Sequence, residues 1–100
     1  MKKEFKESLK RQLIKSLSSE KEIDKIIVFG SFIKSDNPHD IDVAIFQHSA
    51  ESYLTLAMKY RKLTRKIAKK IPIDIIPVKP DAKNNSFLSE IESGELIYER

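Results

Sequence analysis

The stretch FGSFIKSDNPHDIDVAIF, residues 29–46, ends one short apolar run and begins another. The first run, residues 26–29, is short and rich in β-branched residues, and it stops at Gly30, which predicts a strand. Residues 35–38, Ser-Asp-Asn-Pro, have the composition of a turn. In residues 41–46, Ile41, Val43 and Ile45 alternate with Asp42, Ala44 and Phe46, which predicts a second strand with two distinct faces. The stretch therefore predicts two strands joined by a polar connection.

Two carboxylates stand at the start of the second strand. Asp40 and Asp42 are two residues apart, so in a strand they point to the same side. Like charges this close repel, and a hard divalent cation such as Mg²⁺ relieves the repulsion while sharing itself with substrate phosphates. A single Asp-x-Asp is also common where the first Asp caps a turn and the second is merely exposed. The pair indicates a metal clamp only if a further ligand joins it.

Asp74 is the candidate third ligand. It lies in IPIDIIPV, residues 71–78, an apolar run that predicts a third strand, with two prolines that favour a sheet edge or irregular ends. An unpaired carboxylate buried there would cost several kcal/mol. Either Asp74 points to water from an edge strand, or it converges with Asp40 and Asp42. In the second case three carboxylates could hold two metal ions about 3.5–4 Å apart, as in phosphoryl and nucleotidyl transfer.

Gly30 and Ser31 supply a candidate phosphate site beside these carboxylates. Gly30 has no Cβ, so a phosphate can approach its backbone closely. Ser31 offers a hydroxyl and an amide where a helix could begin, which would be an anion site. The alternative is an ordinary strand-ending glycine. The chain has only one other glycine, Gly94, so a glycine placed just before the carboxylates favours the phosphate interpretation.

The remaining elements follow from periodicity and capping residues. Apolar residues at four-residue steps predict a helix over residues 3–18. A second helix is expected from the N-cap Ser49, with Glu51 in its first turn, to about residue 70. Residues 86–93 predict a short helix that carries Phe87, Leu88 and Ile91 and stops at Gly94, and residues 96–98 predict a last strand. The expected core stripe of the second helix is Tyr53, Leu56, Tyr60, Leu63 and Ile67. This order predicts an α/β or α+β fold in which a small mixed β-sheet packs against helices.

Composition limits the function classes. The chain has 100 residues, which predicts a single domain over residues 1–100, and it has no cysteine, which excludes disulfides, cysteine zinc sites and a thiol nucleophile. No apolar run approaches the roughly 20 residues of a membrane span, and the N-terminus does not resemble a secretory signal, so we expect a cytoplasmic protein without membrane contact. Residues 59–70 hold seven basic and no acidic residues. Such a segment can meet phosphates, but it is more often the solvated face of a helix.

The combined pattern resembles a known superfamily. Gly30-Ser31, eight intervening residues, Asp40-Ile41-Asp42, and then Asp74 in an apolar strand look like the signature of the polymerase-beta-type nucleotidyltransferases. The small size resembles the minimal nucleotidyltransferases of that superfamily, and the likeness covers nearly the whole chain. One departure is that many members carry an arginine shortly after Gly-Ser, where this chain has Lys34. Lysine offers a point charge rather than a bidentate fork, which bears on nucleotide preference and rate more than on fold.

The resemblance implies a function for each of these residues. It implies a Mg²⁺-dependent transfer of a nucleoside monophosphate, AMP from ATP, to a hydroxyl of a macromolecular acceptor. Asp40, Asp42 and Asp74 would be the catalytic residues and the ligands of two Mg²⁺ ions, with Asp74 also helping to deprotonate the acceptor. Gly30, Ser31 and Lys34 would hold the triphosphate. Minimal members often sit beside a helical HEPN-type partner, which implies one half of a toxin–antitoxin-like module.

Other interpretations differ in their sequence requirements. A catalytically weak antitoxin that neutralises its partner by binding would not need all three carboxylates. A nucleic-acid-binding module based on residues 59–70 would be expected to interleave aromatic residues, and that segment has only Tyr60. A His-Asp phosphohydrolase reading of His39 and Asp40 lacks the further histidines it needs, and no P-loop, dinucleotide-binding or zinc-protease motif occurs. Homo-oligomerisation and RNA as a partner remain open.

Overall fold

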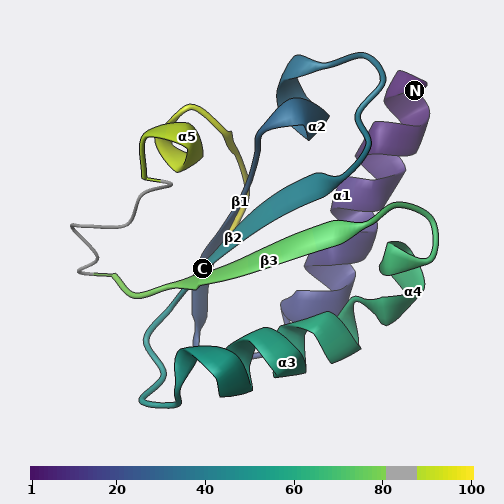
Figure 1. Cartoon of the computed structure of the whole chain (residues 1–100). Helices are drawn as coiled ribbons and strands as arrows, with labels where there is room; N and C mark the ends of the chain where they lie inside the picture. Colours follow the sequence, from purple (N-terminus) through teal and green to yellow (C-terminus); the bar gives the residue numbers. More distant parts are fainter. Residues whose placement is uncertain (81–87) are drawn as a thin grey trace.

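The computed structural model describes residues 1–80 and 88–100, and its centre is one four-stranded sheet with the strand order β3-β2-β1-β4 (Figure 1). The strands are β1 (Ile23–Phe29), β2 (Ile41–Gln47), β3 (Ile73–Val78) and β4 (Glu95–Glu99). β1 is antiparallel to both β2 and β4, whereas β2 and β3 are parallel. The expected mixed sheet is confirmed, and β3, the strand with Pro77, lies at an edge as its proline favours.

The two faces of the sheet pack against different helices. α1 (Lys3–Leu17), α3 (Tyr53–Leu63) and α4 (Arg65–Ala68) share one large core with alternate residues of the strands, among them Ile26 and Val43. α5 (Leu88–Glu92) covers part of the opposite face, where Ile91 packs with Phe29 and Ala44. Residues two apart in a strand point to the same face of the sheet. Asp42 is two residues from Ala44 in β2, and Asp74 is four residues from Val78 in β3, so both aspartates point to the face that α5 covers. The helical layer of α1, α3 and α4 is therefore on the other side of the sheet from the carboxylates.

The structure moves several expected boundaries by one to three residues. β1 begins at Ile23 rather than at residue 26. The helix that could begin at Ser31 is present as the short α2 (Ser31–Lys34). The third strand begins at Ile73 rather than at residue 71. α5 ends at Glu92, and the part of the predicted helix at residues 86 and 87 lies outside the described residues.

The helix after β2 begins and ends at other residues than the sequence predicted. Ser52 is the N-cap, because its side chain accepts from the backbone N–H of Thr55, so the prediction of Ser49 as N-cap with Glu51 in the first turn is wrong. α3 ends at Leu63, and Thr64, whose hydroxyl donates to the Tyr60 carbonyl at 2.9 Å, separates it from α4.

The predicted core stripe is only partly buried. Leu56, Tyr60 and Ile67 are buried, whereas Tyr53 is 59% and Leu63 37% exposed. The two exposed residues are the ends of the helix: Tyr53 is the first residue of α3, and Leu63 is its last, just before the break at Thr64. No helix within residues 1–80 and 88–100 is long and apolar enough to cross a lipid bilayer.

Candidate active site

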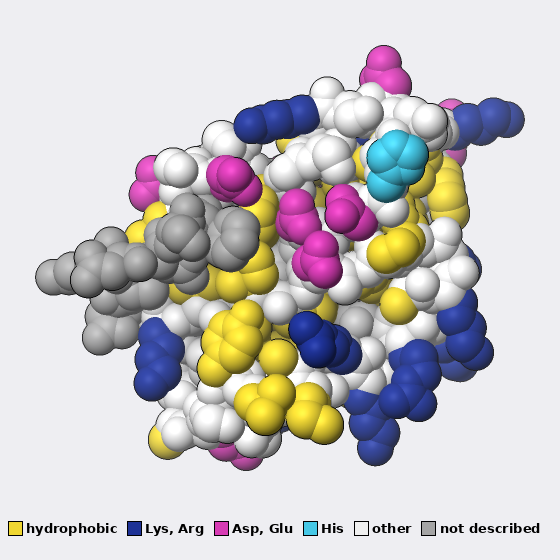
Figure 2. All heavy atoms as spheres, in the orientation of Figure 1, with side chains coloured by type: hydrophobic (Ala, Val, Ile, Leu, Met, Phe, Trp, Pro, Cys, Tyr) yellow, Lys and Arg dark blue, Asp and Glu magenta, His cyan; other side chains and the backbone are white. Residues whose placement is uncertain are grey.

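Three aspartates from two neighbouring strands meet at one place. Asp42 in β2 is the register partner of Asp74 in β3, and Asp40 directly precedes β2. One carboxylate oxygen from each of Asp40, Asp42 and Asp74 lies within 4.8 Å of the others. Figure 2 shows acidic side chains gathered near the middle of this face of the molecule. The expected convergence of the three carboxylates is confirmed.

The register that joins Asp42 to Asp74 is fixed by backbone hydrogen bonds. The N–H of Ile41 donates to the Pro72 carbonyl at 2.9 Å, just before the two strands begin to pair. From there Ile41 pairs with Ile73 and Asp42 with Asp74. A slip by one residue would turn one of the two carboxylates to the opposite face. The parallel ladder therefore sets the site.

The three carboxylates differ in exposure. Asp74 is exposed and Asp40 and Asp42 are half-buried, so Asp74 faces solvent from an edge strand and also converges with the other two carboxylates. Asp74 escapes burial because it is the second residue of an edge strand. Burial, followed by the negative charges of Asp40 and Asp74, raises the pKa of Asp42 from 3.8 to about 6. Asp42 is the carboxylate whose charge is most costly in the protein alone.

Gly30 is required at this site for a reason of space. Its φ of 76° lies in the left-handed region that favours glycine. A Cβ at this position would collide with the carboxylate of Asp42. The glycine expected to admit a phosphate therefore also makes room for one of the three carboxylates.

Ser31 and Lys34 lie on the short helix that follows Gly30. The Ser31 hydroxyl donates to Oδ1 of Asp40 at 3.3 Å, so the Gly-Ser pair contacts two of the three carboxylates. Lys34 is the exposed last residue of α2. Lys6 of α1 holds the end of α2 by donating from Nζ to the carbonyls of Phe32 at 2.8 Å and Ser35 at 2.6 Å.

Glu90 is a charged neighbour that the sequence interpretation did not assign. Its negative charge adds to the raised pKa of Asp42, although less than burial, Asp40 and Asp74 do. It lies on α5, which covers the carboxylate face. The only sequence signal was the glutamate-rich segment at residues 86–99, which gave no position relative to Asp42.

The donor set suits a hard divalent cation. The three carboxylates, whose oxygens lie within 4.8 Å of one another, offer oxygen ligands only, and Mg²⁺ and Mn²⁺ prefer oxygen ligands. A cation would offset the mutual repulsion that raises the pKa of Asp42. Because Asp74 is exposed, the group opens to solvent and can admit both a cation and phosphate oxygens.

Solved structures of similar fold come from toxin–antitoxin complexes. The structure of a tri-AMPylated Shewanella oneidensis HEPN toxin in complex with an MNT antitoxin matches with a TM-score of 0.65 and 18% identity, over 95% of this chain and 73% of the matched chain. The toxin–antitoxin MntA–HepT matches with a TM-score of 0.63 and 15% identity, over 94% and 73%. A toxin–antitoxin structure with AMP-PNP matches with a TM-score of 0.65 and 17% identity, over 91% and 73%. At these identities the likeness establishes the fold.

Sequence comparison establishes the family. No curated protein is significantly similar to the chain in sequence. The family model described as polymerase beta, nucleotidyltransferase, matches residues 11–100, which include the Gly-Ser pair and all three aspartates. This chain therefore belongs to the polymerase beta family and is a nucleotidyltransferase.

Proposed function

We propose that the chain transfers AMP from ATP to a hydroxyl of a HEPN-type partner protein, as one half of a toxin–antitoxin module. The observation that carries the proposal is the convergence of Asp40, Asp42 and Asp74 within 4.8 Å in a chain of the nucleotidyltransferase family. An antitoxin that acted by binding alone would have no need of this arrangement.

The three aspartates have distinct roles in the proposed reaction. Asp40 and Asp42 would bind Mg²⁺, and Asp74 would be the third ligand. The bound ions supply charge neutralisation at the triphosphate and at the attacking and leaving oxygens. Asp74 is the exposed member, so it is the carboxylate that an incoming acceptor hydroxyl can reach.

The proposed reaction is a nucleophilic substitution at the α-phosphorus of ATP. The acceptor oxygen forms a bond to the α-phosphorus of ATP while the bond from that phosphorus to the β-phosphate oxygen breaks. Pyrophosphate leaves with the electron pair, and the hydroxyl proton passes to Asp74 or to water. Much of the enzyme's contribution is then to hold the two reactants in line.

Gly30, Ser31 and Lys34 would hold the triphosphate of ATP. Gly30 has no side chain to keep a phosphate away, and the Asp42 carboxylate lies on the side where a Cβ would be; Ser31 presents its hydroxyl beside Asp40. Lys34 adds a positive charge at the end of the same helix. We expect Lys34 to affect KM for the nucleotide more than the chemical step, because a lysine acts there as a point charge.

A protein partner is supported by two observations. Chains of this fold occur in structures described as complexes of an MNT antitoxin with a HEPN toxin. In addition, Tyr53, Leu54 and Met58 of α3 are 59%, 64% and 60% exposed. Figure 2, in which the β3 edge of the sheet is in front, shows hydrophobic side chains over α3 and the acidic cluster on the other side of this edge. An apolar surface of this kind marks a protein interaction site.

Co-incubation with the partner tests the proposal. The purified chain and a HEPN-type protein encoded beside it would be incubated with each of the four NTPs and with Mg²⁺ or Mn²⁺. In the cell, a reaction that consumes ATP would take place in the cytoplasm, which holds NTPs. Mass spectrometry should find AMP on a tyrosine, serine or threonine of the partner. Asp42→Asn should abolish the adduct, and Asp36→Asn, a matched change of an exposed aspartate in the preceding turn, should not.

Two other outcomes would replace the proposal. If the partner binds and is neutralised equally well by the wild type and by Asp42→Asn, the chain acts as an antitoxin by binding alone. If the chain by itself transfers nucleotide efficiently to a free small molecule or to RNA, the protein acceptor is wrong.

A further inference from the structure

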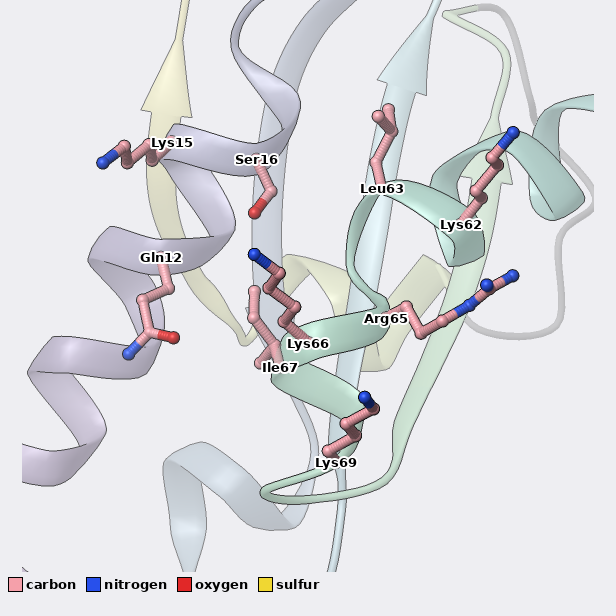
Figure 3. Close-up of a pocket in the computed structure, with 9 residues that line it drawn as sticks. All are labelled: Gln12, Lys15, Ser16, Lys62, Leu63, Arg65, Lys66, Ile67 and Lys69. Atoms are coloured by element: carbon pink, nitrogen blue, oxygen red, sulfur yellow. The ribbon is translucent and has the colours of Figure 1, made fainter.

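A concave, strongly basic surface lies on the helical layer, away from the three aspartates. It has a volume of about 680 Å³ and lies between α1 and the α3–α4 segment (Figure 3). Nine residues line it, and five of them are basic, namely Lys15, Lys62, Arg65, Lys66 and Lys69. We call this surface the basic groove. None of its lining residues belongs to β2, β3 or α5, so it is distinct from the carboxylate site.

The break at Thr64 creates the groove. The buried Thr64 hydroxyl donates to the Tyr60 carbonyl, which ends α3, and α4 begins at the next residue. Ile67 then packs into the core, while Arg65 and Lys66 remain exposed at the surface beside α1. Lys70 ties the end of this segment to α1 by donating from Nζ to Oε1 of Gln12 at 3.0 Å. Two separate parts of the chain thus contribute charge to one hollow.

The five cations of the basic groove lack acidic partners. Within residues 1–80 and 88–100, none of them takes part in an ion pair. Lys59, which precedes them on α3, behaves differently, because it pairs with Glu20 at 2.7 Å and Glu22 at 3.0 Å. Five unpaired like charges around one concave surface repel each other and create a strong positive potential. A bound polyanion would relieve that repulsion.

The arrangement favours an extended polyanion over a single small anion. In Figure 3, Lys66 points toward Ser16 across the gap, whereas Lys62 and Arg65 extend from the side of the α3–α4 segment farther from α1. Lys15 extends from the opposite side of α1. The cations therefore lie on both flanks of the groove, with Lys66 pointing across it, so a single small anion in the hollow could not reach all of them, whereas an extended chain of phosphates could.

The composition of the groove favours a nucleic acid over an acidic protein as its ligand. Protein–protein interfaces are depleted of lysine and use apolar and aromatic anchors at their centre. The groove is rich in lysine, and its only apolar lining residues are Leu63 and Ile67, of which Ile67 is buried. Protein–nucleic acid interfaces are much more positive. No aromatic residue lines the groove, so contact would be to phosphates and not by stacking on bases.

We propose that the basic groove binds the phosphate backbone of a nucleic acid, without reading its sequence. This site does not depend on the proposed AMP transfer, since it uses other residues on the other side of the sheet. The phosphates would be contacted by five residues: Lys62 of α3, Arg65 and Lys66 of α4, Lys69 just after α4, and Lys15 of α1.

Binding of labelled oligonucleotides by the full chain tests the proposal. Fluorescence anisotropy would be measured with single-stranded RNA, DNA of the same sequence and the DNA duplex, at several salt concentrations. Inorganic polyphosphate and oligoglutamate would serve as competitors. Log affinity should fall with log salt by about 0.7 for each phosphate contacted on a single strand. The three oligonucleotides then show which nucleic acid the groove prefers.

Two matched variants separate the groove from overall charge. The groove variant has glutamine in place of Lys62, Arg65, Lys66 and Lys69. The control variant has glutamine in place of Lys2, Arg11, Lys21 and Lys79. All eight residues are exposed, and each variant removes three lysines and one arginine from the 19 basic residues, which leaves 15 against 15 acidic ones.

The expected result is a difference between these two variants. The groove variant should lose at least about tenfold in affinity, and its salt slope should fall by as much as about 3, because up to four phosphate contacts are gone. The control variant should lose much less, and Lys66→Gln alone should reproduce part of the loss. Thermal melts should show both multiple variants folded.

Three results would overturn the proposal. Equal losses in the groove and control variants would show that only net charge matters. Groove-dependent binding of oligoglutamate or polyphosphate that exceeds binding of every oligonucleotide would assign the groove to another polyanion. No saturable binding of RNA or DNA at low salt would remove the site altogether.

Discussion

Asp42 in β2 and Asp74 in β3 are register partners in a parallel strand pair, and an oxygen of one carboxylate lies within 4.8 Å of an oxygen of the other. Two negative charges this close repel, and the charge of Asp74 contributes to the raised pKa of Asp42, after burial and the charge of Asp40. We therefore expect Asp42 to release its proton when a divalent cation binds between the three carboxylates.

Asp42 makes the metal-free protein less stable as the pH rises. Burial and the neighbouring charges of Asp40 and Asp74 raise its pKa from 3.8 to about 6 in the folded state, so between about pH 4 and 6 the folded protein binds a proton that the unfolded chain does not. The contribution of Asp42 protonation to the free energy of unfolding is fully present below pH 4 and is lost as the pH rises through 6. With solvent screening taken into account, Asp42→Asn should gain about 1 kcal/mol at pH 7. Urea unfolding in EDTA at pH 4 and pH 7 measures this difference, with Asp36→Asn as the control; an equal gain at both pH values would contradict it.

A divalent cation should stabilise the folded chain and permit nucleotide binding. Mg²⁺ or Mn²⁺ should raise Tm at pH 7, and ATP should raise it further only when the cation is present, because three carboxylates and a triphosphate otherwise repel. Asp40→Asn and Asp42→Asn should each remove most of both shifts. Differential scanning fluorimetry checks this, and equal ATP shifts in EDTA and in Mg²⁺ would disprove it.

Gly30→Ala should couple energetically to Asp42. The backbone conformation of Gly30, with φ 76° and ψ −150°, alone costs roughly 1–3 kcal/mol for a residue with a Cβ, and the collision with the Asp42 carboxylate adds to this. In the Asp42→Ala background the collision disappears and only the backbone cost remains. Denaturant unfolding of the two single variants and the double variant should give a coupling of about 1 kcal/mol. Additive effects would show that Gly30 is needed only for its backbone conformation.

Gly94→Ala should loosen the packing of β4 and α5 on β1. A Cβ at Gly94 would lie 2.6 Å from the carbonyl oxygen of Val28 and 2.7 Å from Cβ of Phe29. Neither is the far end of a flexible side chain, so the chain must shift, at a cost of about 1–3 kcal/mol. Thermal unfolding measures the loss. Ser93→Ala, an exposed neighbour, is the control and should change Tm little.

Two serines before α3 distinguish the observed cap from the expected one. Ser52→Ala removes the acceptor of the Thr55 N–H and should destabilise the protein by about 1 kcal/mol. Ser49→Ala removes only a local contact with the Glu51 N–H and should have a smaller effect. Chemical denaturation of both variants provides the comparison, and a larger loss in Ser49→Ala would contradict the assigned helix start.

The sequence by itself determined the features that depend on local periodicity. β-branched runs gave the strands, the four-residue step gave α1, and the spacing of Asp40 and Asp42 put both on one side of β2. The reason is that side-chain direction in a strand or helix is set by the backbone geometry of the same few residues. The motif formed by Gly30, Ser31 and the three aspartates was specific enough to indicate the family that the sequence comparison establishes.

Only the tertiary structure decided which distant residues meet. The pairing of Asp42 with Asp74 depends on the crossover through α3 and α4 and on the hydrogen bond from Ile41 to Pro72. The exposure of Asp74 follows from the position of β3 at the sheet edge, and Gly30 is needed because the Asp42 carboxylate occupies the space beside it. The basic groove likewise exists only because Thr64 ends α3 and the following turn lies against α1. These contacts join residues far apart in the chain, and their geometry is fixed by packing of the whole core rather than by the preferences of any one segment.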